Sequence, residues 1–186
     1  MNWTLPGSTL QVDLNRPEAA KEICESLFIA GGLVLSQVCQ ITGLEPYTVQ
    51  NWVKRGFLTH PENKKYNCDQ LCRLLIINTL KTAMPMESVC RLLSYVNGRL
   101  DDTSDDIIPD SKMYFIFTRL ASTCSNAWSP ADLERVIETA LAQNWLECPN
   151  AEAQKRVAQV LEVIANAWFA SQFQKRAVNQ LTALGL

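Results

Sequence analysis

The chain has 186 residues, of which 47% are hydrophobic and 19% are charged, with a formal net charge of -2. This composition is too apolar for a disordered protein, and no apolar run approaches the roughly 20 residues that a membrane helix needs. Because the first residues also lack the basic start and apolar stretch of a secretion signal, we expect a cytoplasmic protein without a membrane partner.

The seven cysteines are an odd number in a chain without an export signal, which argues against a disulfide framework. Cys68 and Cys72 lie four positions apart, so they would share one face of a helix, and His60 or Cys90 could complete a metal site. Because there is no CxxC pair, we interpret the cysteines as packing residues. We therefore expect neither a metal nor another cofactor.

The first 32 residues are predicted to form an arm followed by one helix. Residues 1–15 show no helical periodicity, whereas apolar residues recur at helical spacing over residues 16–30. Gly31 and Gly32 then end the helix.

Residues 33–98 are divided by glycines and prolines into short segments, which is typical of a small helical module. The pattern predicts a helix, a turn at Gly43, a second helix over about 46–55, an extended loop over 57–66, and two more helices before Gly98. The expected fold class is therefore mainly α with a short β wing.

The turn at Gly43 indicates a helix-turn-helix, because two short helices that cross steeply need a residue without a side chain between them. Apolar residues stand where the two helices would face each other. They are Val38, Cys39 and Leu44 on the first helix and the turn, and Val49, Trp52 and Val53 on the second helix.

The second helix is well delimited, with Pro46 near its first position and Gly56 just past its end. When its apolar residues face inward, its opposite side carries Tyr47, Gln50, Asn51 and Lys54. Amide side chains pair with adenine, and lysine binds guanine or phosphate. This side is therefore predicted to read bases in the major groove.

The segment after the second helix, residues 57–66, is predicted to be a wing that contacts phosphates. Phe57 and Leu58 suit a short strand, and the residues from Pro61 to Asn63 suit a turn. A further set of residues is expected to contact DNA, either at its phosphates or from the wing. They are Ser36, Thr48, Arg55, His60, Asn63, Lys64, Lys65 and Tyr66.

Positive charge is concentrated in the same part of the chain. Residues 33–99 contain eight basic and four acidic residues, whereas residues 100–186 contain seven basic and eleven acidic residues. A local basic surface suits phosphate binding, and the acidic remainder would repel DNA.

The stretch from Leu35 to Leu93 resembles the DNA-binding head of MerR-type winged helix-turn-helix regulators. It also resembles uncharacterised bacterial proteins that pair such a head with a helical C-terminal body. The resemblance covers about a third of the chain. It rests on Val38, Gly43, Leu44, Thr48, Val49, Gly56, Leu58, Pro61, Tyr66, Leu71, Arg73 and Leu74.

The chain departs from this family at the residues that would read bases. Gln50 stands in place of the family's recognition arginine, Asn51 and Trp52 replace its tyrosine pair, and Val53 replaces the glutamate that follows. Gln70 replaces the aspartate after the wing, and the wing is shorter. The resemblance therefore implies the scaffold but not the target sequence.

The rest of the chain is predicted to be an acidic linker, residues 99–109, and an all-helical body, residues 110–186. Helices are expected from Pro109 to about Cys124, from Ser129 to about Asn144, and from about Ala151 to Leu181. The aromatic residues of this body suit either core packing or a pocket for a small-molecule effector. They are Trp128, Trp145, Trp168, Phe169 and Phe173.

Together these patterns predict a sequence-specific DNA-binding transcriptional regulator that forms a homodimer through its C-terminal helices. The competing interpretation is a protein–protein interaction adaptor that uses the same helices without binding DNA. Paired carboxylates, a nucleophile motif and a glycine-rich phosphate loop are all missing from the sequence, so we do not expect an enzyme.

Overall fold

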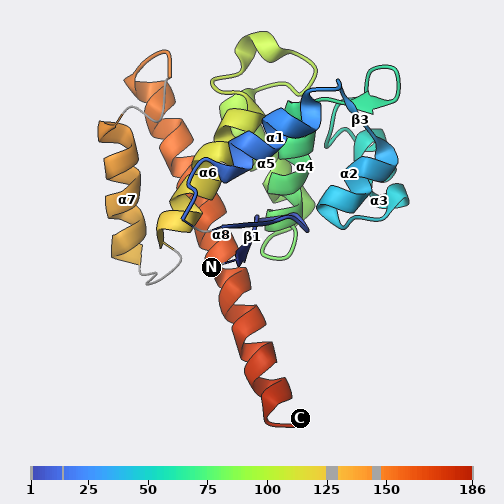
Figure 1. Cartoon of the computed structure of the whole chain (residues 1–186). Coiled ribbons are helices and arrows are strands. Elements are labelled where there is room, and N and C mark those ends of the chain that lie inside the picture. The colour runs from blue at the N-terminus through green and yellow to red at the C-terminus, as the bar shows by residue number, and fades with distance from the viewer. Residues whose placement is uncertain (1, 14, 125–129, 144–147, 186) are drawn as a thin grey trace.

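The computed structural model describes residues 2–13, 15–124, 130–143 and 148–185. Within these ranges the chain forms eight α-helices, one short 3-10 helix and two two-stranded antiparallel sheets (Figure 1). The prediction of a mainly helical fold is confirmed. No helix in the described part of the chain combines the length and apolar character needed to cross a membrane.

The helices and strands occupy the following ranges. The helices are α1 (Ala19–Phe28), α2 (Leu35–Thr42), α3 (Pro46–Lys54), α4 (Cys68–Leu80), α5 (Met86–Asn97), α6 (Asp110–Cys124), α7 (Pro130–Ala142) and α8 (Ala151–Ala183), with a 3-10 turn at Thr103–Asp105. The strands are β1 (Asn2–Thr4), β2 (Gln11–Asp13), β3 (Leu33–Val34) and β4 (Lys65–Tyr66).

The N-terminal segment, predicted to be an arm, forms a β-hairpin. β1 pairs antiparallel with β2, with Trp3 opposite Val12. Leu5 and Val12 are buried, and the Tyr114 hydroxyl donates a hydrogen bond of 2.8 Å to the carbonyl of Pro6. Strands of three residues are too short to show a period of two in the sequence, which explains the missed prediction.

The loop of this hairpin is held against α4 and the end of α2. The Asn78 side-chain amide donates hydrogen bonds to the carbonyl of Gly7 at 2.7 Å and to that of Thr42 at 2.9 Å. Gly7 has a positive φ of 71°, and a Cβ added there would lie 2.1 Å from the carbonyl oxygen of Leu75. The close approach of the loop to α4 therefore requires glycine at this position.

Helix α4 is the central helix of the fold. Every residue from Leu71 to Ile77 is buried, including the charged Arg73, and α6, α8, α2 and α5 all pack against it (Figure 1). A helix that is apolar on nearly all sides is stable only when neighbours surround it.

The predicted linker connects two parts of one core. Buried residues of 33–98 and of 110–186 belong to the same hydrophobic cluster, and Ile108, inside the predicted linker 99–109, is itself buried. The acidic composition of this segment suggests a spacer, but α6 follows it directly and packs on α4. The helices expected in the C-terminal part are present as α6, α7 and α8.

A buried ion pair joins α4 to the start of α6. Arg73 Nη1 lies 3.0 Å from Asp110 Oδ2, with side-chain exposures of 7% and 12%. Arg73 Nε also donates to the carbonyl of Phe57 at 3.0 Å, and the Asn97 side-chain amide donates to Asp110 Oδ1 at 3.2 Å. Since each charge has several hydrogen bonds, the pair fixes the relative positions of these segments.

The described aromatic residues of the C-terminal part mostly pack in the core. Trp168 makes edge-to-face contacts with Trp3, Phe117 and Phe169, at centroid distances of 6.0, 6.3 and 4.7 Å. Phe173 is half exposed. Trp128 and Trp145, the other two aromatic residues considered for an effector pocket, lie outside the described residues.

The close approach of the hairpin loop to α4 gives a first prediction. Gly7→Ala should lower the free energy of unfolding by more than Gly56→Ala, although the two glycines have nearly equal φ values of 71° and 72°. Both changes carry the cost of a left-handed alanine, about 1–2 kcal/mol. Only Gly7→Ala adds overpacking, about 1–3 kcal/mol, because nothing lies within 4 Å of a Cβ at Gly56. Urea unfolding of both variants measures the difference. Equal losses in the free energy of unfolding would contradict the close packing of the hairpin loop against α4.

A second prediction concerns Asp106, which lines the pocket beside the Arg73–Asp110 pair. Burial and the nearby carboxylates of Asp110 and Asp105 raise the pKa of Asp106 from 3.8 to about 6. Between these two values the folded chain binds more protons than the unfolded chain, so its stability falls as the pH rises from about 4 to 6. Asp106→Asn should remove this loss. The stability of the variant relative to the wild type should therefore be higher at pH 7 than at pH 4. Urea unfolding at several pH values across this range measures the effect, with Asp101→Asn, a change at an exposed position, as the control. Parallel stability profiles for Asp106→Asn and the wild type would disprove the prediction.

Candidate nucleic-acid interface

Helices α2 and α3 meet at the turn that the sequence predicts. Gly43 adopts a left-handed conformation with φ 68°, and its N–H donates to the Cys39 carbonyl at 2.8 Å. The Thr42 hydroxyl donates to the Val38 carbonyl and accepts from the Leu44 N–H, which closes the end of α2. Leu44 is buried in the turn, as expected.

Helix α3 is oriented as its apolar pattern predicts. Val49, Trp52 and Val53 are buried, with Val49 fully enclosed. The predicted base-reading side chains, Tyr47, Gln50, Asn51 and Lys54, are all exposed, and Tyr47 reaches 72% exposure. Within the described part of the chain, these four side chains form no hydrogen bond or ion pair, so their polar groups are free to meet a ligand.

The segment predicted to be a wing contains one short strand, β4, but its partner is not the predicted one. β4 pairs antiparallel with β3, with Leu33 opposite Tyr66 and Val34 opposite Lys65. Phe57 and Leu58 are not a strand, which corrects the prediction. Leu58 is buried, and the Arg55 guanidinium lies 4.7 Å from the centre of the Phe57 ring. Their apolar character therefore reflects packing.

The return of the predicted wing depends on unusual backbone conformations. Asn63 and Lys64 have positive φ angles of 48° and 62°, and the Lys65 N–H donates to the Glu62 carbonyl at 2.8 Å. At the base, a Cβ on Gly32 would lie 2.8 Å from Lys65 Cβ and 2.9 Å from the Tyr66 carbonyl oxygen. Gly32 therefore does more than end α1, because it lets β3 approach β4.

The predicted phosphate-binding residues do not all face solvent. Ser36, His60, Asn63, Lys64 and Lys65 are exposed, and Thr48 is half-buried. Arg55 is exposed, but it lies 3.7 Å from the Glu87 carboxylate.

Tyr66 is the one residue of this predicted set that the structure buries. Its side chain is buried, and burial raises the pKa of its hydroxyl. Successive side chains of a strand point to opposite faces, so when Lys65 faces outward Tyr66 must face the core. Tyr66 therefore exposes almost none of its side chain to solvent, unlike the neighbouring Lys65.

A hollow of about 530 Å³ lies between α3 and the predicted wing. It brings together Gln50 and Lys54 from α3 with His60 and Lys64 from the predicted wing. The rest of its lining is largely apolar and consists of Leu35, Val53, Pro61 and Tyr66. Five residues that the sequence assigns to a binding surface, these four and Tyr66, thus line one depression.

Gln70 has a positioning role that the sequence did not reveal. Its side-chain amide donates to the Thr59 hydroxyl at 2.9 Å and to the His60 carbonyl at 3.1 Å, and its Oε1 accepts from the Asn67 N–H at 2.9 Å. Asn67 in turn caps α4 by accepting from the Gln70 N–H at 2.8 Å. This capping box holds both ends of the predicted wing, and its signal is the Asn-x-x-Gln spacing.

The part of the chain that contains the candidate interface is similar to a known protein family. Residues 32–117 match the family described as Domain of unknown function (DUF1836). The match begins just before β3 and ends inside α6, so it runs through the predicted linker.

One curated relative is similar over part of the chain. This relative, Uncharacterized protein YkrK from Bacillus subtilis (strain 168), is 36% identical over 84 residues. The aligned part is 43% of this chain, and the chain spans 36% of the length of that relative. No solved structure matches.

Proposed function

We propose that this protein is a DNA-binding transcriptional regulator that places α3 in the major groove. The observation that carries the proposal is the free polar face of α3, formed by Tyr47, Gln50, Asn51 and Lys54, directly beside the basic turn of the predicted wing. A helix held on a packed scaffold with an unpaired polar face has the form and chemistry that the major groove accepts.

The chemistry of the α3 face favours direct contact with base edges. Gln50 and Asn51 each carry an amide that can donate to and accept from adenine at the same time. Lys54 stands at the C-terminal end of the helix, where it can reach guanine or a phosphate. Because Gln50 and Asn51 differ from the arginine and tyrosine of MerR-type heads, we expect a preference for adenine that is this chain's own.

Cations of the predicted wing would hold the DNA backbone. Lys64 and Lys65 are exposed, and neither forms an ion pair within the described residues. Lys54 lines the same hollow as Lys64, so the phosphate-facing charges lie on both sides of the depression. Such contacts set orientation and affinity and carry no sequence information.

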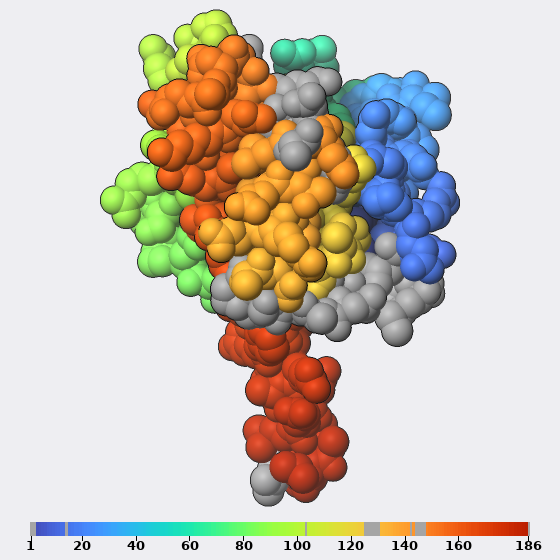
Figure 2. Space-filling model, turned by 90° about the vertical axis from the view of Figure 1, so that its left-hand side faces the viewer, coloured from blue at the N-terminus to red at the C-terminus, as the bar shows by residue number. Residues whose placement is uncertain are grey.

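The proposed partner of the C-terminal helix is a second copy of this chain. The last turns of α8 extend away from the rest of the molecule (Figure 2), and residues 173–185 are exposed. Phe173, Leu181 and Leu184 recur at helical spacing and are 50%, 50% and 74% exposed. An apolar stripe of this kind on a solvent-facing helix favours pairing with another helix. Two copies would present two α3 helices to two half-sites.

The hollow beside α3 also supports a second candidate, an adaptor that binds another protein. Leu35, Val53, Pro61 and Tyr66 give the hollow an apolar lining that could receive a side chain of a protein partner. Such a protein would need no basic surface.

The two candidates are separated by selecting bound duplexes from a random DNA pool with the full chain. Enrichment of an inverted repeat is expected for a dimeric regulator, with adenine at the positions that Gln50 and Asn51 would contact. Recovery of unenriched DNA after several rounds would contradict the regulator and favour the adaptor. The double variant Gln50→Ala/Asn51→Ala tests the readout, since it should lose sequence preference and keep weak binding to any duplex.

The role of the predicted wing gives a further prediction. Lys64→Ala/Lys65→Ala should weaken binding to all duplexes alike and reduce the slope of log affinity against log salt by about 2, since each phosphate contact contributes about 0.9. The matched control is Lys21→Ala/Lys155→Ala, which removes the same charge from exposed positions on α1 and α8. Fluorescence anisotropy at several salt concentrations measures both. The same slope in the wing variant and the wild type would exclude phosphate contacts there.

A further inference from the structure

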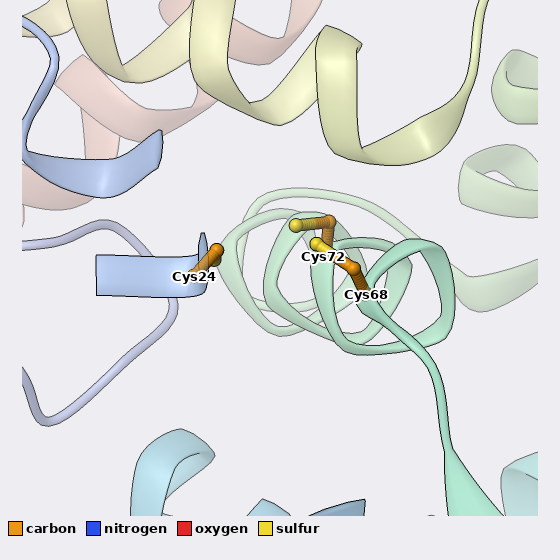
Figure 3. A group of neighbouring side chains, drawn as sticks. All are labelled: Cys24, Cys68 and Cys72. Atoms are coloured by element: carbon orange, nitrogen blue, oxygen red, sulfur yellow. The ribbon is translucent and has the colours of Figure 1, made fainter. Parts of the chain in front are cut away.

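Three cysteines from two separate parts of the chain meet in the structure (Figure 3). Cys24 comes from α1, and Cys68 and Cys72 come from the first turns of α4. Their sulfur atoms all lie within 4.8 Å of one another. Neither His60 nor Cys90, the partners that the sequence suggests for Cys68 and Cys72, belongs to this group.

Local structure explains how the cluster forms. Cys68 is the first residue of α4 and Cys72 follows one turn later, so both sulfurs lie on the same side of that helix. Cys24 lies on the buried side of α1 with Ala20. The packing of α1 then places Cys24 opposite the two thiols of α4, an arrangement that spacing along the sequence cannot reveal.

The cluster is enclosed but not sealed. Cys72 is fully buried and Cys24 is 4% exposed, whereas Cys68 is half-buried. Hydrogen bonds from Cys24 and Cys72 lower the pKa of the Cys68 thiol to about 4, and the hydrogen bond to Cys68 raises the pKa of Cys24 to about 12. Burial raises the pKa of Cys72. The three thiols thus interact directly with one another, as expected for sulfur atoms that lie within 4.8 Å of each other.

We propose that Cys24, Cys68 and Cys72 bind one Zn²⁺ ion through their three sulfur atoms. Zn–S bonds of about 2.3 Å in a tetrahedral arrangement place the sulfurs about 3.8 Å apart. The present separations, all within 4.8 Å, are close to that spacing. Because Cys68 is only half-buried, solvent could supply a water molecule as the fourth ligand.

The chemistry of the cluster selects among metal ions. Three sulfur ligands exclude Ca²⁺ and Mg²⁺, which bind oxygen, and favour Zn²⁺ or Cu⁺. The charged side chains that act on Cys24 and Cys68 are Glu25 and Asp69, both acidic. A divalent ion with three thiolates leaves one net negative charge, whereas Cu⁺ leaves two. In these acidic surroundings the less negative complex with Zn²⁺ is favoured.

Metal binding would connect α1 to the start of α4. Cys68 follows the predicted wing strand β4 after a single residue, Asn67, which caps α4. The ion would therefore cross-link the segment before β3 to the segment after β4. Because the three ligands come together only in the folded chain, binding should stabilise the fold, whatever the fate of the proposed DNA-binding function.

The test is metal titration of the full, reduced chain without oxygen, using Co²⁺ as a spectroscopic probe and then Zn²⁺. We expect one equivalent of Co²⁺ to give sulfur-to-metal charge-transfer absorption that Zn²⁺ abolishes by displacement. Thermal unfolding should shift upward by roughly 5–10 °C when free Zn²⁺ exceeds the dissociation constant about a hundredfold. No absorption and no shift would overturn the proposal.

Single variants identify the ligands. Cys24→Ala and Cys68→Ala should each weaken Zn²⁺ binding by more than about 100-fold, whereas Cys39→Ala and Cys90→Ala, two half-buried cysteines outside the cluster, should bind as the wild type does. If Cys24→Ala fails to fold, the half-buried Cys68→Ala still decides the outcome. Undiminished affinity in a folded cluster variant would overturn the site. Formation of a disulfide between two of the three cysteines in a chain that binds no Zn²⁺ would overturn it in favour of a redox pair.

Discussion

The first turns of α4 hold together most of what surrounds the candidate interface. Cys68 and Cys72 face α1, and Asp69 Oδ1 accepts a hydrogen bond from the Ser111 N–H at the start of α6. Gln70 binds the backbone of the predicted wing, and Arg73 joins the Phe57 carbonyl to Asp110. Neighbours surround most of α4, so that its buried polar side chains, Gln70 and Arg73, must find partners inside the protein.

The arrangement gives the candidate interface a rigid support. α3 packs against α2, and its residues Val49 and Trp52 are buried. The Asn78 side chain joins Thr42, the last residue of α2, to the N-terminal hairpin loop. The predicted wing is held at its base by β3 and on its inner side by Gln70. A recognition surface needs such support, because a shift of about 1 Å is enough to misplace base contacts.

The helices could be predicted well, because their signals are local. The apolar spacing of Val157, Leu161 and Ile164 predicts α8, and these residues are buried as expected. Pro46 and Gly56 mark the ends of α3 within a residue or two. Strands were predicted poorly: β1, β2, β3 and β4 each have two or three residues, and Phe57–Leu58 looks more like a strand than Leu33–Val34 does. Pairing of such short segments is decided by what packs against them.

The sequence by itself determined the helices, the turn at Gly43 and the polar face of α3, since each depends on residues within about two turns of one another. Only the tertiary structure decided that β3 closes the predicted wing, that Tyr66 is buried, and that the acidic segment 99–109 lies within one core. The same holds for the three-cysteine cluster, because Cys24 reaches Cys68 and Cys72 only through the packing of α1 beside α4. Contacts between distant segments depend on the shape and burial of whole helices, which no short pattern of residues records.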